Sequence, residues 1–329
     1  MNNQQVLLIK RPTGLPRDEN WKLNEKPVEP IKDGEILIKV KYLSLDPAMR
    51  GWMNEGKSYI EPVALGEPMR AGGVGEVVQS NDPSFQPGDH VSGVLNAQSY
   101  AITTSKGLAK IDPNVAPLPT YLGTLGMPGL TAYFGLYNVG NIKPEDTVLI
   151  SGGAGAVGAV AGQIAKNVGC KVIGIAGGQE KCQYMKEIGF DGVIDYKSES
   201  IYKALKEAAP KGIDVYFDNV GGETLDIALS RLRYKGRIVI CGAISQYNSE
   251  NVVGPANYLS LLVNRARMEG FVVFDYVKEY PKAMTELIKL YTDGKLKSKE
   301  HIVKGLETFN DSLNMLFSGK NFGKLVLEI

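Results

Sequence analysis

A glycine-rich turn at residues 152–158 is the segment of this sequence best suited to chemistry. It reads Gly-Gly-Ala-Gly-Ala-Val-Gly, a variant of the dinucleotide fingerprint with glycines three residues apart. A β-type run, 148–150, precedes it, and small and apolar residues typical of a helix follow at 159–168. A strand, a tight turn and a helix N-terminus in that order direct backbone N–H groups and the positive end of the helix dipole at one point. That point suits the pyrophosphate of a dinucleotide.

The next expected strand, 171–176, indicates which dinucleotide is bound. NAD-binding proteins carry an acidic residue about 20 residues past the glycines, where it bonds the ribose 2′-hydroxyl. Here the strand ends in Ala-Gly-Gly at 176–178, and Lys181 follows within one helical turn, where it could pair with a 2′-phosphate. The sequence therefore favours NADPH over NADH. In the alternative interpretation, Glu180 and Lys181 are only the solvated first turn of a helix.

Composition and charge exclude several classes of function. The 329 residues, 43% hydrophobic, can bury a sizeable core, most often in two domains. Lys and Arg (37) nearly balance Asp and Glu (36), so we expect no attraction to nucleic acid or to an anionic membrane. No signal peptide or transmembrane run is visible. The isolated Cys170, Cys182 and Cys241 fit a reducing cytoplasm.

Residues that could ligate a metal are scarce in this chain. His90 and His301 are the only histidines, and no Cys or His pair has the spacing of a zinc site. We therefore expect no metal, and the same scarcity disfavours Ser-His-Asp and Cys-His hydrolases. His90 follows Pro-Gly-Asp, a context more typical of a turn leading into a strand than of a catalytic group.

The hydrophobic pattern changes near residue 118. Up to that point the chain is β-rich, with short strands expected at 6–10, 35–40, 74–78 and 90–94. Beyond it, helices and strands alternate, which predicts an α/β fold with a doubly wound parallel sheet. We expect a strand from residue 147 and a helix from 156, further strands at 171–176, 192–196, 214–218, 237–241 and 271–274, and further helices at 122–139, 180–188, 201–209, 223–233 and 281–292. The tail, 324–329, alternates like a strand and could return to the β-rich part.

Two segments of small residues follow strands of this predicted sheet. They are 218–222, Asp-Asn-Val-Gly-Gly, and 241–245, Cys-Gly-Ala-Ile-Ser. Each alone is compatible with an ordinary strand-to-helix turn. Ligands of such sheets bind beyond the carboxyl ends of the strands, and both segments fall at that end. Together they predict a surface on which a flat nicotinamide ring can lie.

With these segments in view, the sequence resembles the zinc-free medium-chain dehydrogenases/reductases. The most similar group is that of leukotriene B4 12-hydroxydehydrogenase/prostaglandin reductases, plant alkenal double-bond reductases and bacterial curcumin reductases. The resemblance runs nearly end to end. It rests on the segments Tyr-Leu-Ser-Leu-Asp-Pro (42–47), Met-Arg-Gly (49–51), Pro-Gly-Asp (87–89), Leu-Gly-Thr-Leu-Gly-Met-Pro-Gly-Leu-Thr-Ala-Tyr (122–133), Gly-Ala-Val-Gly (155–158), Tyr-Phe-Asp-Asn-Val-Gly-Gly (216–222), Cys-Gly-Ala-Ile-Ser (241–245) and Asn-Phe-Gly-Lys (321–324).

The resemblance implies two domains with an active-site cleft between them. One is a GroES-like β-rich catalytic domain, residues 1–118 joined by 298–329, and the other is a Rossmann NADP-binding domain, residues 119–297. The resemblance also implies NADPH as cofactor and a homodimer.

The resemblance further implies which residues contact the cofactor. Gly155, Ala156, Val157 and Gly158 match residues on the pyrophosphate, Lys181 and Tyr196 match 2′-phosphate contacts, and Asn219 matches a contact beyond the strand 214–218. The segments around the nicotinamide and its ribose are matched by Cys241, Gly242, Ala243, Ile244, Ser245, Tyr247, Phe271, Val272, Val273 and Asn321. Structural interpretations stay open for several of them: Phe271 and Val273 as core strand residues, Asn321 as the cap of a turn, and Tyr196 as a surface aromatic.

The sequence departs from the family pattern at two pocket tyrosines. Ala48 and Val263 stand in their places, so a mechanism that relies on those phenols does not transfer, and no catalytic residue is assigned. Tyr59 is the nearest remaining candidate for the pocket. A loop aromatic that packs on the β-rich domain is an equally good interpretation of Tyr59.

The expected reaction is hydride transfer to the carbon–carbon double bond of an α,β-unsaturated ketone or aldehyde. Conjugation makes the β-carbon electrophilic, so the protein need only orient the nicotinamide and stabilise the developing enolate, and solvent can protonate the α-carbon. Two alternatives stay open, an NADPH:quinone reductase and a non-catalytic NADPH-binding protein. The expected substrates are small molecules: an enone, an enal or a quinone.

Overall fold

Two units make up the chain in the computed structural model, which describes residues 1–329. Unit 1 comprises residues 1–122 and 300–329, and unit 2 comprises residues 123–299. The breaks expected from the sequence were after residues 118 and 297. None of the helices has the length and apolar character that crossing a bilayer requires.

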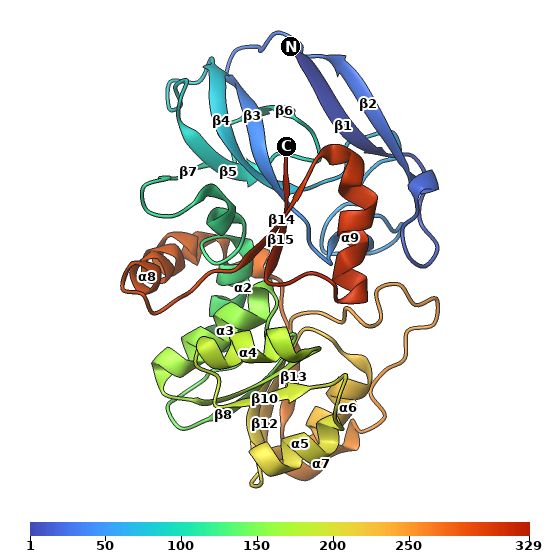
Figure 1. The fold of residues 1–329 in the computed structure, drawn as a ribbon, viewed down its shortest axis with the longest axis vertical. Helices are drawn as coiled ribbons and strands as arrows, with labels where there is room; N and C mark the ends of the chain where they lie inside the picture. Colours follow the sequence, from blue (N-terminus) through green and yellow to red (C-terminus); the bar gives the residue numbers. More distant parts are fainter. The chain divides into compact units, whose positions relative to one another are not determined.

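Unit 1 is built on a seven-stranded sheet (Figure 1). The strands follow the order β14-β15-β3-β4-β5-β7, β6 also pairs with β3, and β1 and β2 form a separate antiparallel pair. The strands are β1 (Asn2–Leu8), β2 (Trp21–Pro27), β3 (Glu35–Ser44), β4 (Gly72–Ser80), β5 (His90–Val94), β6 (Tyr100–Thr104), β7 (Ala109–Lys110), β14 (Glu300–Lys304) and β15 (Lys324–Glu328). The helices are α1 (Met49–Trp52) and α9 (Phe309–Ser318), with 3-10 turns η1 (Asp18–Asn20), η2 (Leu118–Leu122) and η5 (Leu306–Thr308). Strand β15 pairs with β3, Val326 opposite Ser44, which confirms the expected return of the tail to the β-rich part.

Two cations of the segments 49–51 and 321–324 hold backbone in place within unit 1. The Nζ of Lys324, only 2% exposed, donates to Asp46 Oδ1 at 2.7 Å and to the Leu45 carbonyl at 2.8 Å. The buried guanidinium of Arg50 donates to the carbonyls of Gly14 at 2.9 Å and Pro12 at 3.1 Å. Burial lowers the pKa of Arg50. Because their donors are engaged, these side chains fix turns in unit 1.

Unit 2 contains a six-stranded sheet in the order β10-β9-β8-β11-β12-β13, with every neighbouring pair parallel. In chain order this is 3-2-1-4-5-6, the doubly wound order that binds dinucleotides where the winding reverses, between β8 and β11. The strands are β8 (Thr147–Ser151), β9 (Lys171–Ala176), β10 (Gly192–Asp195), β11 (Ile213–Asp218), β12 (Leu232–Ile240) and β13 (Arg267–Gly270). The helices are α2 (Met127–Phe134), α3 (Ala156–Val168), α4 (Gln179–Glu187), α5 (Ile201–Ala208), α6 (Gly222–Ser230), α7 (Leu259–Asn264) and α8 (Tyr280–Thr292), with a π-helical turn η3 (Gly135–Val139) and a 3-10 segment η4 (Val273–Glu279).

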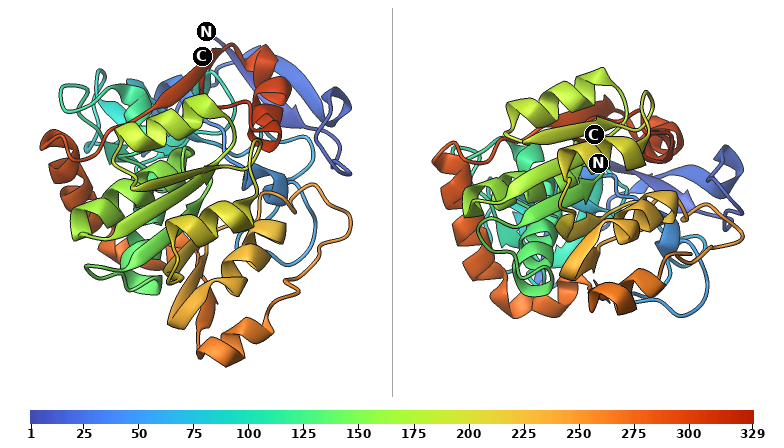
Figure 2. Two further views of the ribbon diagram at one scale, coloured as in Figure 1. Left: turned by 60° about the horizontal axis from the view of Figure 1, so that its bottom comes forward. Right: turned by 90° about the horizontal axis from the view of Figure 1, so that it is seen from below.

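Helices cover both faces of this sheet. In Figure 1, α3 and α4 lie on one side of the strands and α5, α6 and α7 on the other, and Figure 2 shows the same covering from two further directions. Val148, Leu149 and Ile150 of β8 are fully buried, as expected of a strand covered on both faces. The sheet is therefore the rigid support for the turns at its carboxyl edge.

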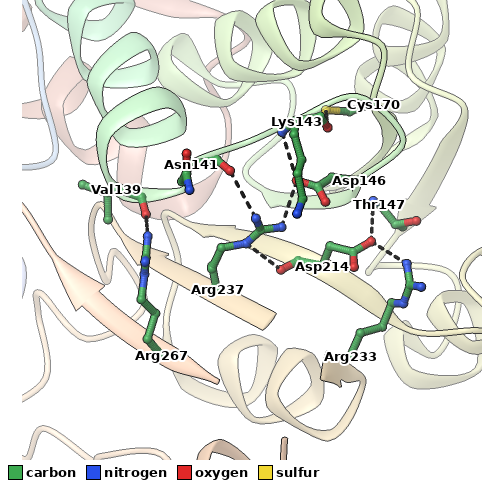
Figure 3. A network of polar contacts seen from close by, with 10 residues as sticks. All are labelled: Val139, Asn141, Lys143, Asp146, Thr147, Cys170, Asp214, Arg233, Arg237 and Arg267. Carbon is green, nitrogen blue, oxygen red and sulfur yellow. Dashed lines mark hydrogen bonds and ion pairs between the residues drawn. The ribbon is translucent and has the colours of Figure 1, made fainter. Parts of the chain in front are cut away.

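A polar network closes the opposite, amino edge of the sheet (Figure 3). Arg237 of β12 pairs with Asp146 at 2.8 Å, and both side chains are nearly buried, at 12% and 6% exposure. Arg237 also donates to the Asn141 carbonyl at 3.1 Å. Asp214 accepts from the Thr147 N–H and from Arg233, each at 2.8 Å. These bonds hold the loop before β8 to the neighbouring strands. They lie at the end of the strands opposite to the carboxyl edge.

The predicted positions of two elements in unit 2 were wrong. The helix expected at 122–139 begins only at Met127, because Gly123 and Gly126 precede it and Pro128 can occupy only a first turn; the final residues to Val139 form η3. The strand expected at 271–274 lies at Arg267–Gly270, since β13 pairs with β12 only as far as Ile240 opposite Gly270. The apolar, β-branched Phe-Val-Val-Phe run suggested a strand, but it follows β13 and enters η4. Strands β2, β6, β7 and β14 and helices α1, α7 and α9 were not expected.

Candidate functional site

The turns that follow the parallel strands of unit 2 meet at one edge of the sheet, the carboxyl edge. Residues 155–158 open α3 after β8, and Lys181 lies in the first turn of α4 after β9. Tyr196 follows β10, Asn219 follows β11, and 241–247 follow β12. The remaining predicted segment of unit 2, 271–273, follows β13. Only Asn321 belongs to unit 1.

The glycine-rich turn between β8 and α3 is tightly closed. Gly152 has a φ of +62°, and its carbonyl accepts the N–H of Gly155 at 2.9 Å. A Cβ on Gly158 would stand 2.2 Å from the Gly152 oxygen, so no larger residue fits there without moving the turn. The first N–H groups of α3 have no partner within the helix. The turn thus presents backbone donors at a helix N-terminus, as a pyrophosphate requires.

Two neighbouring turns, after β9 and after β10, carry the residues expected to contact a 2′-phosphate. The carboxylate of Asp195 accepts the N–H of Gly178 at 2.8 Å and the N–H of Lys197 at 3.0 Å, which ties the turn after β9 to the turn after β10. These bonds hold the pKa of Asp195 below its usual range. The ring of Tyr196 lies over Gly177, where an added Cβ would stand 2.7 Å from Tyr196 Cζ. Asp195 was not singled out from the sequence, because an acidic residue at the end of a strand is no distinctive signal.

Positive charge collects at these two turns. Burial lowers the pKa of Lys181, and the nearby charge of Lys197 lowers it further. A doubly negative phosphate beside these two ammonium groups would reverse that unfavourable effect. The end of β9 itself, Ala176, carries no carboxylate. The local chemistry therefore suits a 2′-phosphate better than a ribose hydroxyl.

Asn219 follows β11, and two hydrogen bonds hold it to Ser151 at the end of the neighbouring strand β8. Its side-chain nitrogen donates to the Ser151 carbonyl at 2.7 Å, and its backbone N–H donates to Ser151 Oγ at 2.9 Å. These bonds leave the amide oxygen of Asn219 available to a ligand. Ser151 lies at the end of a buried strand and was not singled out from the sequence, because a serine there has no distinctive signal.

The turn after β12 is fastened to the turn after β11. Ser245 donates to the Val220 carbonyl from both its N–H, at 3.1 Å, and its hydroxyl, at 2.6 Å. The Tyr247 hydroxyl accepts the N–H of Ala243 at 3.2 Å. Burial raises the pKa of the Cys241 thiol to about 12, which favours its protonated form. These contacts account for Ser245 and Tyr247 as residues that shape the turn.

Past β13, residues 271–273 lie beyond the carboxyl end of the strand. The ring of Phe271 packs near Gly135, where an added Cβ would stand 2.8 Å from Phe271 Cζ. The carbonyl of Val273 accepts from the Tyr280 hydroxyl at 3.1 Å. Phe271 therefore packs against a neighbouring segment, which was one of the interpretations open from the sequence, but it does not lie within a strand.

The other residues singled out from the sequence have the following surroundings. The side chain of Asn321 donates to the Gly323 carbonyl at 3.2 Å, so it closes the turn before β15. Tyr59 is 54% exposed and its hydroxyl accepts from Trp52 Nε1 at 3.0 Å. Val263 lies on α7 and is 68% exposed. His90 lies on β5 opposite Glu76, whereas His301 Nδ1 accepts the Phe322 N–H at 3.3 Å. No group of three or more His, Cys, Asp and Glu side chains is arranged to hold a metal ion.

Two family models match the chain. One, described as the N-terminal domain of oxidoreductase, matches residues 4–111, and the other, described as zinc-binding dehydrogenase, matches residues 156–289.

Known proteins are similar to this chain over nearly its whole length. The NADP(+)-dependent 2-alkenal reductase of Nicotiana tabacum is 42% identical over 337 residues, covering 100% of this chain and 98% of that protein. Prostaglandin reductase 1 of Mus musculus is 40% identical over 322 residues, covering 96% and 95%. The crystal structure of CurA in complex with NADPH from Vibrio vulnificus superposes with a TM-score of 0.93 at 41% identity, covering 99% of this chain and 98% of that chain.

Proposed function

The chain belongs to the family of NADP-dependent medium-chain reductases that includes the 2-alkenal and prostaglandin reductases, and we propose that it reduces the carbon–carbon double bond of α,β-unsaturated ketones or aldehydes with NADPH. The observation that carries the proposal is the carboxyl edge of unit 2. There, the backbone donors of the turn before α3 suit a pyrophosphate, and the neighbouring positive charges of Lys181 and Lys197 suit a 2′-phosphate.

The chemistry of the residues at the carboxyl edge of unit 2 supports NADPH as the cofactor. Gly155, Ala156, Val157 and Gly158 would hold the pyrophosphate through backbone N–H groups, and the missing Cβ at 158 leaves the room that the turn needs. Lys181 and Tyr196 would hold the 2′-phosphate. Asn219, the turn 241–247 and the segment 271–273 would line the nicotinamide and its ribose.

When bound, NADPH supplies a hydride to the β-carbon of the substrate. The chain's task is to keep the cofactor segments rigid, which the bonds of Ser151, Ser245 and Asp195 do. Conjugation spreads the developing charge over an enolate, which weak hydrogen bonds can stabilise, whereas direct carbonyl reduction localises that charge on an alkoxide. The side chains around the site include no arranged metal-ligand group, which supports a zinc-independent reaction.

An isotope-transfer experiment tests the reaction. The enzyme is given a small enone with 4R- or 4S-deuterated NADPH in a buffer that contains EDTA. We expect one of the two labelled cofactors to place deuterium on the β-carbon of a saturated ketone. Deuterium on the carbonyl carbon, in an allylic alcohol, would identify a carbonyl reductase. Turnover of a quinone without enone reduction would establish the quinone reductase alternative, and cofactor binding without any turnover would indicate a non-catalytic protein.

A homodimer and a cytoplasmic location complete the proposal. The edge strand β13 has a partner on one side only, and all four of its residues are exposed. A second copy pairing antiparallel about Met268 would place Arg267 opposite Glu269 twice, which gives charge complementarity. The three cysteines are free and none is paired in a disulfide, which supports a reducing compartment.

A further inference from the structure

One buried carboxyl group stands between the turns of the carboxyl edge. Asp218 ends β11 and is only 1% exposed. Its Oδ1 accepts four hydrogen bonds, from the Tyr216 hydroxyl at 2.7 Å, the N–H groups of Val220 and Gly221 at 2.9 Å each, and the Ser151 hydroxyl at 3.1 Å. The carboxyl group therefore gathers donors from β8, from β11 and from the turn after β11.

The same residue also holds the turn after β12. The backbone carbonyl of Asp218 accepts the N–H of Cys241 at 2.9 Å and the N–H of Gly242 at 3.0 Å. Three turns that carry the proposed cofactor contacts are thus bonded to a single residue. They are the turns that begin at Ser151, at Asn219 and at Cys241.

The second carboxyl oxygen behaves differently. Oδ2 is buried and accepts no hydrogen bond in the structure. An acceptor used on one oxygen only, in a side chain that is buried, is not arranged as a base that exchanges protons with a substrate. Burial raises the pKa of this carboxyl, although its donors oppose the rise. What the site uses is the oxygen Oδ1 as a fixed acceptor.

We propose that Asp218 is the positioning residue of the cofactor site. It sets the spacing of the turns at Ser151 and Asn219 through Oδ1 and holds the turn at Cys241 through its backbone carbonyl, and it takes no part in proton transfer. Without it, the hydroxyl of Ser151 and two backbone N–H groups would lose their common partner. Gly221 has a φ of +71°, and a Cβ added there would stand only 3.1 Å from Ala243 Cβ, so the turns after β11 and β12 approach each other closely. This inference rests on the proposed use of NADPH.

The test compares Asp218→Asn with Asp218→Ala by calorimetric titration with NADPH. Asparagine keeps one oxygen acceptor of the same size, so we expect its Kd to stay within about threefold of the wild-type value. Alanine removes the acceptor, and we expect the Kd to rise by about tenfold or more. A Kd that is unchanged in both variants would overturn the proposal. If Asp218→Asn loses kcat on a turned-over substrate while keeping the wild-type Kd, the carboxyl acts in proton transfer and the proposal is wrong.

Two further variants separate positioning from stability. Asp146→Asn weakens the buried pair with Arg237 at the amino edge of the same sheet (Figure 3), so we expect a lower Tm with an unchanged Kd for NADPH.

Ser151→Ala removes one hydrogen-bond donor to Asp218 and replaces Asp218→Ala in the test if that variant does not fold. The Kd of Ser151→Ala for NADPH should rise at least threefold, which is about half of a tenfold change when expressed as free energy. A Kd that rises equally in Asp146→Asn, or stays at the wild-type value in Ser151→Ala, would contradict the role. Because the readout is binding, a protein that binds NADPH without reducing enones would fail the proposed function and leave this inference standing.

Discussion

At the scale of the residue, the proposed reading of the 2′-phosphate depends on individual side chains in the turns after β9 and β10. Lys181 and Tyr196 come from two turns that Asp195 ties together. Burial and then the positive charge of Lys197 lower the pKa of Lys181, so the charged form of its side chain is disfavoured there. A bound phosphate removes this disadvantage, because an opposite charge favours the ammonium form.

We therefore predict that Lys181→Ala weakens NADPH and spares NADH. A charge-assisted hydrogen bond contributes about 1.5–3 kcal/mol, which corresponds to roughly a 10- to 150-fold rise in the Kd for NADPH. NADH lacks the 2′-phosphate, so its Kd should be nearly unchanged. Lys186→Ala removes the same charge from the exposed surface of α4 and serves as the matched control. Equal losses for both cofactors would show that Lys181 does not read the phosphate.

At the scale of elements, the strand–turn–helix formed by β8, the glycine-rich turn and α3 shows how sterics set the site. Gly158 lies in the first turn of α3, where an alanine would raise helix propensity by about 1 kcal/mol. However, the added Cβ would stand 2.2 Å from the Gly152 oxygen and 3.0 Å from the Gly153 Cα. These are backbone atoms, so the clash is relieved only if the turn itself shifts.

Gly158→Ala is thus expected to be destabilising despite the better helix former. Overpacking of this kind costs typically about 1–3 kcal/mol, which exceeds the gain in propensity. The melting temperature should fall, and the Kd for NADPH should rise because the N–H groups before α3 move. Gly254→Ala, at a position where an added Cβ meets nothing within 4 Å, is the control for both measurements. A higher Tm in Gly158→Ala would refute the steric account.

At the scale of the whole molecule, the open edge of the unit 2 sheet bears on assembly. Strand β13 exposes Met268 beside the charged pair Arg267 and Glu269, and α7 nearby exposes Leu262 and Val263 at 74% and 68%. Apolar side chains next to an unpaired strand edge are the usual sign of a pairing surface.

Charge reversal at this edge tests the proposed dimer. Light scattering on the eluting wild-type protein should give twice the mass of one chain. Glu269→Arg would place arginines opposite one another in the antiparallel pair, so we expect this variant to dissociate to the monomer. Glu187→Arg makes the same change on the exposed side of α4 and should leave the mass unaltered. A monomeric wild type, or a variant that stays dimeric, would exclude this edge as the interface.

The sequence by itself determined the features that depend on local pattern. The alternation of helices and strands after residue 118 predicted the doubly wound sheet, and glycines placed between a strand and a helix predicted the turn at 152–158. The absence of a carboxylate after β9 indicated the cofactor. These inferences succeeded because periodicity, turn chemistry and dipole direction act within a few residues of the chain.

The tertiary structure decided the rest, because the partners lie far apart in sequence. Phe-Val-Val-Phe at 271–274 suggested a strand, yet the register with β12 ended the ladder at Gly270. Strand β14, which was not expected from the sequence, pairs with the parallel edge of β15. Ser151 and Asp218 are separated by 67 residues, so no local signal marks either as part of a network. Which side chains position a site is determined by packing across the sheet, which only the folded chain brings about.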